Sequence, residues 1–148
     1  MDIQRRTFLK QTGTTVAGVC LGCAGAVEAA GSYLSPCSDG YKVEESKLII
    51  DLNKNPKLKE VGGSAKFEAE KKKIIVIHPT EQDYKSFANK CTHKGWTLNY
   101  HYKDGFMKCD LHGSRFGIDG HVIKGPAELV LTEFKTTLNK DELTVYLT

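Results

Sequence analysis

Two short segments of this 148-residue chain place a cysteine close to a histidine, and they constrain its folding more than any other feature. One residue separates Cys91 from His93, and two separate Cys109 from His112. Fifteen residues lie between His93 and Cys109. Thiolates and imidazoles are strong ligands for transition metals. The chain is therefore expected to fold so that two loops face each other across a metal centre.

Short segments with strand character surround both pairs. They are residues 47–52, 65–70, 73–78, 84–90, 97–102, 106–111, 129–138 and 143–148. Tight-turn sequences separate several of them, and no long apolar repeat at helical spacing occurs. This pattern predicts an all-β sandwich or barrel. Gly95 and Gly113 follow the two pairs, where glycine allows a loop to turn sharply and to approach a cofactor.

Three chemical interpretations of the Cys2His2 set are considered. Zinc accepts such a set, but its usual arrangement pairs cysteine with cysteine and histidine with histidine. A disulfide between Cys91 and Cys109 is the second possibility in an exported protein. The third is a cluster of two irons and two sulfides, in which each iron takes two protein ligands. Because each loop here supplies one thiol and one imidazole, the spacing favours the cluster.

These motifs resemble the Rieske [2Fe–2S] centre, in which two histidines replace two cysteines on one iron. The matching segments, in order, are CTHKG (91–95), CDLHGSRF (109–116), GIDGHVIKGPA (117–127) and ELTVYL (142–147). The resemblance implies one [2Fe–2S] cluster, with Cys91 and Cys109 on the buried iron. It places His93 and His112 on the outer iron, which changes valence. It also implies two antiparallel base sheets with a small cluster-binding subdomain inserted at about residues 90–125.

The chain departs from the Rieske proteins of cytochrome bc complexes in each loop. Those proteins have an extra cysteine in each loop, and the two form a disulfide; Trp96 and Leu111 stand at these positions here. We expect an apolar contact between Trp96 and Leu111 to replace the disulfide. Ser114 matches the serine that donates a hydrogen bond to a bridging sulfide. Phe116 stands where high-potential members have a tyrosine donor.

The first residues have the features of an export signal. Arg5 and Arg6 precede a mildly apolar stretch of small residues, and the segment 1–30 resembles a twin-arginine (Tat) signal. That resemblance implies export by the Tat translocase to the periplasm or to the outer face of the cytoplasmic membrane. The signal is either cleaved or kept as an anchor that contacts the membrane. Residues 31–46 are expected to form a flexible tether to a Rieske domain at 47–148.

Composition narrows the function further. The formal charge is only +3 and no basic stripe occurs, which argues against nucleic-acid binding. The 32 residues after Phe116 leave no room for the second iron domain of a Rieske oxygenase. The resemblance therefore implies a one-electron carrier that serves a periplasmic or membrane redox partner. The alternative is the Rieske subunit of a cytochrome bc-type quinol oxidoreductase or of an arsenite-oxidase-like molybdenum enzyme.

The loss of one hydrogen-bond donor at Phe116 gives a first prediction. The midpoint potential should lie in the middle of the ~−150 to +300 mV range of Rieske centres. Phe116→Tyr should raise that potential, because a donated hydrogen bond stabilises the extra negative charge of the reduced cluster. Redox titration followed by electron paramagnetic resonance (EPR) measures it. An unchanged potential would mean that residue 116 lies away from the cysteine sulfur.

Overall fold

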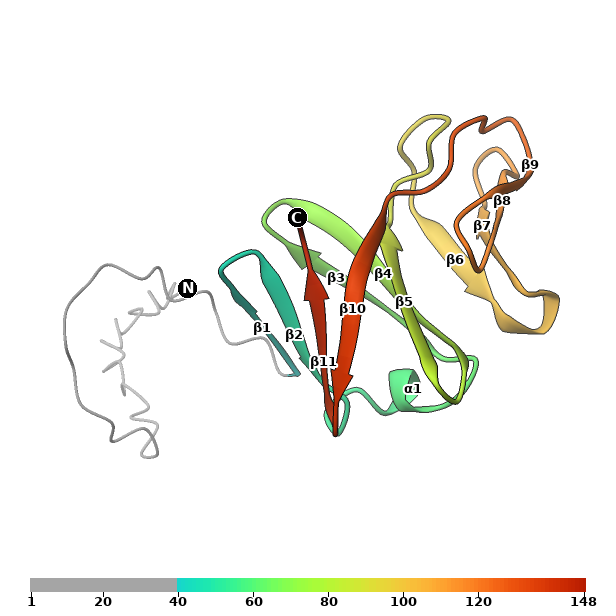
Figure 1. Ribbon diagram of the computed structural model, residues 1–148. Coiled ribbons are helices and arrows are strands. Elements are labelled where there is room, and N and C mark those ends of the chain that lie inside the picture. The colour runs from blue at the N-terminus through green and yellow to red at the C-terminus, as the bar shows by residue number, and fades with distance from the viewer. Residues whose placement is uncertain (1–39) are drawn as a thin grey trace, which may run out of the picture. The chain divides into compact units, whose positions relative to one another are not determined.

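A computed structural model describes residues 40–148, which fold into a mostly β structure (Figure 1). Its strands are β1 (Tyr41–Glu44), β2 (Lys47–Asp51), β3 (Ser64–Ala69), β4 (Lys72–Thr80), β5 (Asp83–Ala88), β6 (Leu98–His101), β7 (Phe106–Cys109), β8 (Arg115–Gly117), β9 (Val122–Lys124), β10 (Glu133–Asn139) and β11 (Glu142–Tyr146). A short helix, α1 (Pro56–Lys59), and a 3-10 turn, η1 (Tyr102–Asp104), complete the elements. Within the described residues, no helix is long and apolar enough to span a bilayer. The all-β prediction is confirmed.

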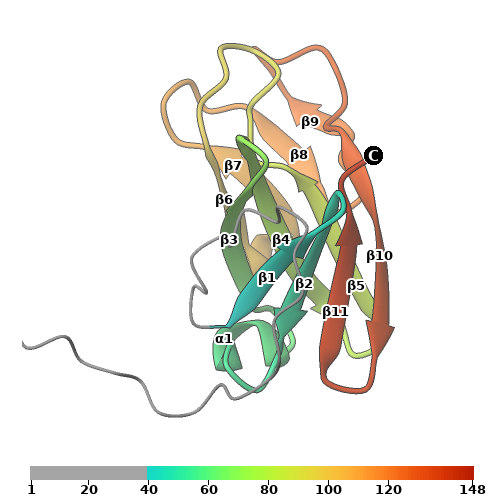
Figure 2. The same ribbon diagram turned by 90° about the vertical axis from the view of Figure 1, so that its left-hand side faces the viewer.

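The strands form two antiparallel sheets. Seven are ordered β1-β2-β11-β10-β5-β4-β3, and four are ordered β6-β7-β8-β9. In Figures 1 and 2 the seven strands curl into a barrel-like wall, and the small sheet stands beside one end of it. The small sheet is inserted in sequence between β5 and β10, as the resemblance implies for the cluster-binding part.

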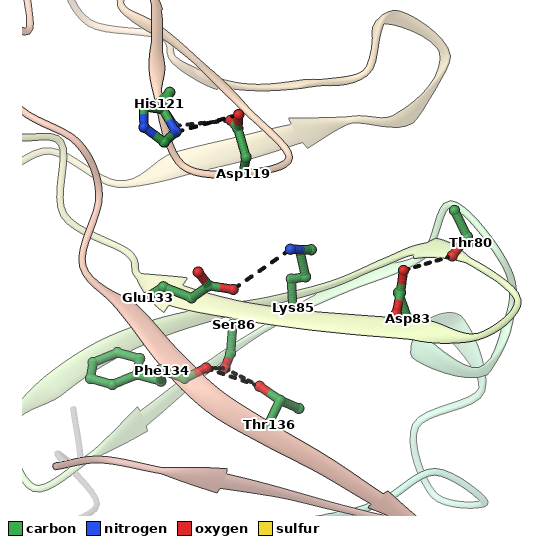
Figure 3. Close-up of polar contacts among 9 residues, drawn as sticks. All are labelled: Thr80, Asp83, Lys85, Ser86, Asp119, His121, Glu133, Phe134 and Thr136. Atoms are coloured by element: carbon green, nitrogen blue, oxygen red, sulfur yellow. Dashed lines mark hydrogen bonds and ion pairs between the residues drawn. The ribbon is translucent and has the colours of Figure 1, made fainter.

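The two expected base sheets, β1-β2-β11-β10 and β10-β5-β4-β3, share strand β10 and are thereby joined into one seven-stranded sheet. Glu133 and Phe134 pair with β5, while residues 135–139 pair with β11. At the junction the Ser86 hydroxyl donates to the carbonyl of Phe134 at 3.0 Å, and Lys85 forms an ion pair with Glu133 at 3.7 Å (Figure 3). Strand β10, which follows the small sheet in the chain, is thereby fixed to β5 at its first two residues.

Strand β4 carries four consecutive apolar residues, Ile74 to Ile77, all 0% exposed. Successive side chains of a strand point to opposite faces. Ile74 and Val76 therefore enter the barrel core, while Ile75 and Ile77 enter a second core beneath the small sheet. Phe87 of β5 joins Ile75 and Ile77 in that second core. A continuous apolar run is what burial on both faces of a strand requires.

The N-terminal boundary of the fold differs from the expected one. The predicted tether (31–46) contains β1, whose residues 41–44 pair with β2 from Lys47 to Ile50. Its alternating half-buried and exposed side chains gave only a weak strand pattern. Arg5, Arg6 and the rest of the segment 1–30 lie outside the described residues.

Two leucines paired across the β10–β11 hairpin allow a matched test of the core. Leu138 and Leu143 are opposite each other, but Leu143 is 0% exposed and Leu138 is 49% exposed. Leu143→Ala should lower the free energy of unfolding by about 2–5 kcal/mol, because it leaves a cavity in the barrel core. Leu138→Ala should change it by less than about 0.5 kcal/mol. Urea unfolding of both variants checks this, and equal losses would place the core elsewhere.

Candidate metal centre

The two cysteine-histidine segments adopt the same backbone hydrogen-bond frame. Around Cys91, its N–H donates to the carbonyl of Trp96 at 2.7 Å, and the N–H of Gly95 donates back to the Cys91 carbonyl at 2.7 Å. Around Cys109, the corresponding bonds are those from Cys109 to Ser114 at 2.8 Å and from Gly113 to Cys109 at 2.9 Å. In each loop the partners lie five and four residues after the cysteine. The two loops are thus structural equivalents, although their histidines are offset by one residue.

Both glycines are required by this frame. Gly95 has φ of 76° and Gly113 has φ of 77°, in the left-handed region. A side chain at either position would be strained. The sequence expectation that these glycines turn the loops agrees with their backbone geometry.

Other polar contacts fix the loops to the fold. The Asn89 side chain, 2% exposed, accepts a hydrogen bond from the Leu98 N–H at 2.7 Å and so closes the base of the first loop. The segment 125–132, here called the cover segment, is tied to both loops. The Thr92 hydroxyl donates to the Leu129 carbonyl at 2.7 Å, and the Ala127 N–H donates to the Ser114 hydroxyl oxygen at 3.1 Å.

The two thiols are buried in the second core. Cys91 is 2% exposed and Cys109 is 0% exposed, and both are free. Leu98 and Cys109 are directly paired between β6 and β7. No S–S bond joins Cys91 to Cys109 in the structure, unlike in the alternative of a disulfide between them. Two free thiols buried in the same core are suited to bind a soft metal centre as thiolates.

The two imidazoles lie together on the outer side of the loops. The ring centroids of His93 and His112 are 4.7 Å apart, with an interplanar angle of 86°. His93 is half-buried and His112 is exposed. Desolvation lowers the pKa of the His112 imidazole, and the charges of His93 and Lys94 lower it further. The neutral imidazole that this favours is the form that ligates metals.

Two unsatisfied polar groups test whether a cluster fits here. His93 Nδ1 is buried without a hydrogen-bond partner. The Ser114 hydroxyl is 0% exposed, and its oxygen accepts from Ala127, so its own hydrogen has no acceptor among the described residues. Buried polar groups normally have partners. A metal at His93 and a sulfide at Ser114 would satisfy both, so these residues fit an iron–sulfur cluster.

No three His, Cys, Asp or Glu side chains within residues 40–148 are grouped so as to hold a single metal ion. The candidate donors are instead arranged as a pair of buried thiols and a pair of outer imidazoles.

The remaining predicted site residues are divided between core and surface. Phe116 is 0% exposed and packs in the second core with both cysteines. Trp96 and Leu111 are 56% and 50% exposed. The expected apolar contact between them stays a prediction. The sequence reasoning missed Asn89, whose side chain acts only through a backbone group nine residues away.

The fold and the candidate site define an all-β protein in which two equivalent loops each supply a cysteine and a histidine. The sequence model of the Rieske [2Fe-2S] domain matches residues 50–135. The chain therefore belongs to the Rieske family and carries one [2Fe–2S] cluster.

Known relatives agree with this assignment. The cytochrome b6-f complex iron-sulfur subunit 3 of Nostoc sp. is 31% identical over 70% of this chain and 55% of its own length. This chain thus spans about half of that protein. The cytochrome b6-f complex iron-sulfur subunit of Chlorobaculum thiosulfatiphilum is 24% identical over 98% of this chain and 76% of its own length. The structure resembles the plasma membrane Rieske protein PetC3 of Synechocystis PCC 6803 (TM-score 0.53, 27% identity, covering 64% and 90% of the chains).

The contacts of Ser114 give a prediction with a matched control. Ser114→Ala should lower the midpoint potential, because a donor to the cluster is lost. It should also lower the free energy of unfolding by about 1–3 kcal/mol, because the buried Ala127 N–H loses its acceptor. Ser86→Ala removes another fully buried hydroxyl, on β5 and away from the loops, and should change stability alone. Equal midpoint potentials in the two variants would show that Ser114 does not donate a hydrogen bond to the cluster.

Proposed function

We propose that Cys91, Cys109, His93 and His112 hold the Rieske cluster, and that the chain passes single electrons between this cluster and a redox protein outside the cytoplasm. The equivalence of the two loops is the observation that carries the proposal. Each loop presents a buried thiol and an outer imidazole from one frame, which is what a cluster with two different irons needs. The bound cluster supplies one-electron oxidation and reduction.

The protein residues determine where electrons enter and leave. The thiols and Phe116 lie in an apolar core, which excludes water from the inner side of the site. His112 is exposed and His93 is half-buried, so the imidazole side is the one that a partner can approach. Trp96 and Leu111, which belong to the same two loops, add exposed apolar surface. A docked partner covering them would shorten the path for an electron and remove water from it.

A second candidate function is favoured by the relatives. Several are named as iron-sulfur subunits of cytochrome b6-f complexes, and one of them aligns with 98% of this chain. On that ground the chain would be the Rieske subunit of a cytochrome bc-type complex at the outer face of the membrane. The residues at 96 and 111 weigh against it, because a tryptophan and a leucine cannot form the disulfide expected in such subunits.

The export part of the proposal depends on Arg5 and Arg6. Replacing both by lysine in the native host should retain the protein in the cytoplasm, because the Tat translocase is expected to read the arginine pair. Fractionation followed by immunodetection measures this. Membrane fractions of the unmodified protein, probed for a co-purifying cytochrome, distinguish a complex subunit from an independent carrier. Export that continues with two lysines would contradict the Tat assignment.

The ligand set is tested by spectroscopy of the purified protein. The wild type should have the visible absorbance of an iron–sulfur cluster and, when reduced, an EPR signal. Cys91→Ser and Cys109→Ser should lose both, because thiolate ligands are removed. His121→Gln changes an exposed histidine that pairs with Asp119 in the β8–β9 turn and should keep both signals. A colourless wild type containing one zinc ion would overturn the proposal.

A further inference from the structure

The small sheet has a row of cations on the face opposite to the cysteines. Lys108 of β7 pairs with Arg115 of β8, and Arg115 pairs with Lys124 of β9. Directly paired residues in antiparallel strands point to the same face. These three residues, here called the cationic row, therefore stand side by side on three neighbouring strands.

Burial shows which face carries the row. Met107, Cys109 and Phe116 alternate with the row along β7 and β8, and each is 0% exposed. The row therefore lies on the solvent side of the sheet. The side chain of Lys108 is 34% exposed, Lys124 is exposed, and Arg115 is half-buried.

The row is poorly neutralised by the protein. Lys108 has one carboxylate partner, Asp110 at 3.3 Å. Within residues 40–148, no carboxylate forms an ion pair with Arg115 or Lys124. Asp119, in the turn between β8 and β9, pairs with His121 at 3.3 Å (Figure 3). Like charges directly opposite each other on neighbouring strands destabilise a sheet, so the folded protein retains an unfavourable arrangement here.

The row continues toward the barrel. Asn99 of β6 is paired with Lys108. Its side-chain oxygen accepts a hydrogen bond from Lys66 of β3 at 2.6 Å, and its amide nitrogen donates to Asp110. The four cations Lys66, Lys108, Arg115 and Lys124 therefore lie on strands β3, β7, β8 and β9, and Asp110 is the carboxylate that bonds to Lys108 and Asn99. The surrounding contacts hold Lys66 and Lys108 in place and leave Arg115 and Lys124 available.

Arg115 is held in a fixed orientation. Its guanidinium carbon lies 4.7 Å from the centre of the Phe106 ring, within the range of a cation–π contact. Its Nε is buried and has no hydrogen-bond partner. A guanidinium fixed on an aromatic ring has little conformational freedom to lose when it binds, and its planar fork suits a carboxylate.

We propose that the cationic row is the docking surface for an acidic protein, which places carboxylates on Arg115 and Lys124. The inference rests on the proposed function for the partner's identity as a redox protein. Lys108 directly precedes Cys109 in the chain, so the row lies one residue from a proposed cluster ligand, on the opposite face of the sheet. The charge complementarity supplies the attraction and the orientation.

A protein surface fits this face better than an anionic membrane does. Proteins that lie on a bilayer combine cations with aromatic or leucine side chains that enter the lipid. The aromatic residue of this face, Phe106, is half-buried and lies under Arg115. Arg115 therefore covers the Phe106 ring and keeps it from entering a lipid layer.

The test uses the cluster-loaded full chain and an end-blocked oligoglutamate peptide as the acidic probe, with calorimetry at low salt. The wild type should bind the peptide, and added salt should weaken the binding. Arg115→Gln combined with Lys124→Gln should weaken it about tenfold, as expected for two ion pairs at a surface. Lys57→Gln combined with Lys73→Gln removes the same charge from α1 and β4 and should keep the wild-type affinity.

Further controls make the result decisive. Lys124→Glu alone, on the exposed edge strand β9, makes the same change of charge and should also weaken binding about tenfold, which covers the case that Arg115→Gln disturbs folding. Equal weakening by the two double variants would overturn the proposal, because it would show attraction by net charge alone. Binding to phosphatidylglycerol vesicles through the row, without peptide binding, would overturn it in favour of a lipid surface. The EPR signal reports the cluster separately, so peptide binding by a protein that never takes up a cluster would contradict only the proposed function.

Discussion

The packing of β4 on both of its faces supports the rest of the structure. Ile74 and Val76 pack in the barrel core, and Ile75 and Ile77 pack in the second core together with the two cysteines. Each buried isoleucine contributes about 1.5–3 kcal/mol by leaving water, and the two sets share one rigid backbone. The core that holds the two cysteines is therefore formed in part by strands β4 and β5 of the barrel sheet.

The small sheet separates two kinds of chemistry by its two faces. Its inner face carries Cys109 and Phe116 in an apolar core, and its outer face carries the cationic row one residue away along the chain. A strand achieves this separation because its side chains alternate. The centre can thus be kept dry while charges close to it remain in water. The exposed imidazole of His112 lies on neither face of the sheet, because it belongs to the loop between β7 and β8.

The sequence predicted the fold class and the paired loops because both depend on local patterns. Alternating and continuous apolar segments indicate strands, and the spacing of Cys91, His93, Cys109 and His112 indicates two loops of similar form. The strand β1 was missed because its pattern is only half-buried. The role of Asn89 was also missed, because a single buried amide that bonds to a distant backbone group leaves no periodic signal. The joining of the sheets by β10 depends on twist and pairing that a sequence pattern does not contain.

The cover segment connects the two loops to a part of the chain that is made after them. Thr92 and Ser114 bind Leu129 and Ala127, and the segment is continuous with β10, which closes the barrel. The loops therefore gain these two hydrogen-bond partners only after residues 127 and 129 have been synthesised. A chain that ends before residue 125 contains both cysteines but lacks the cover segment. Both cysteines are thus synthesised before the segment that bonds to their loops.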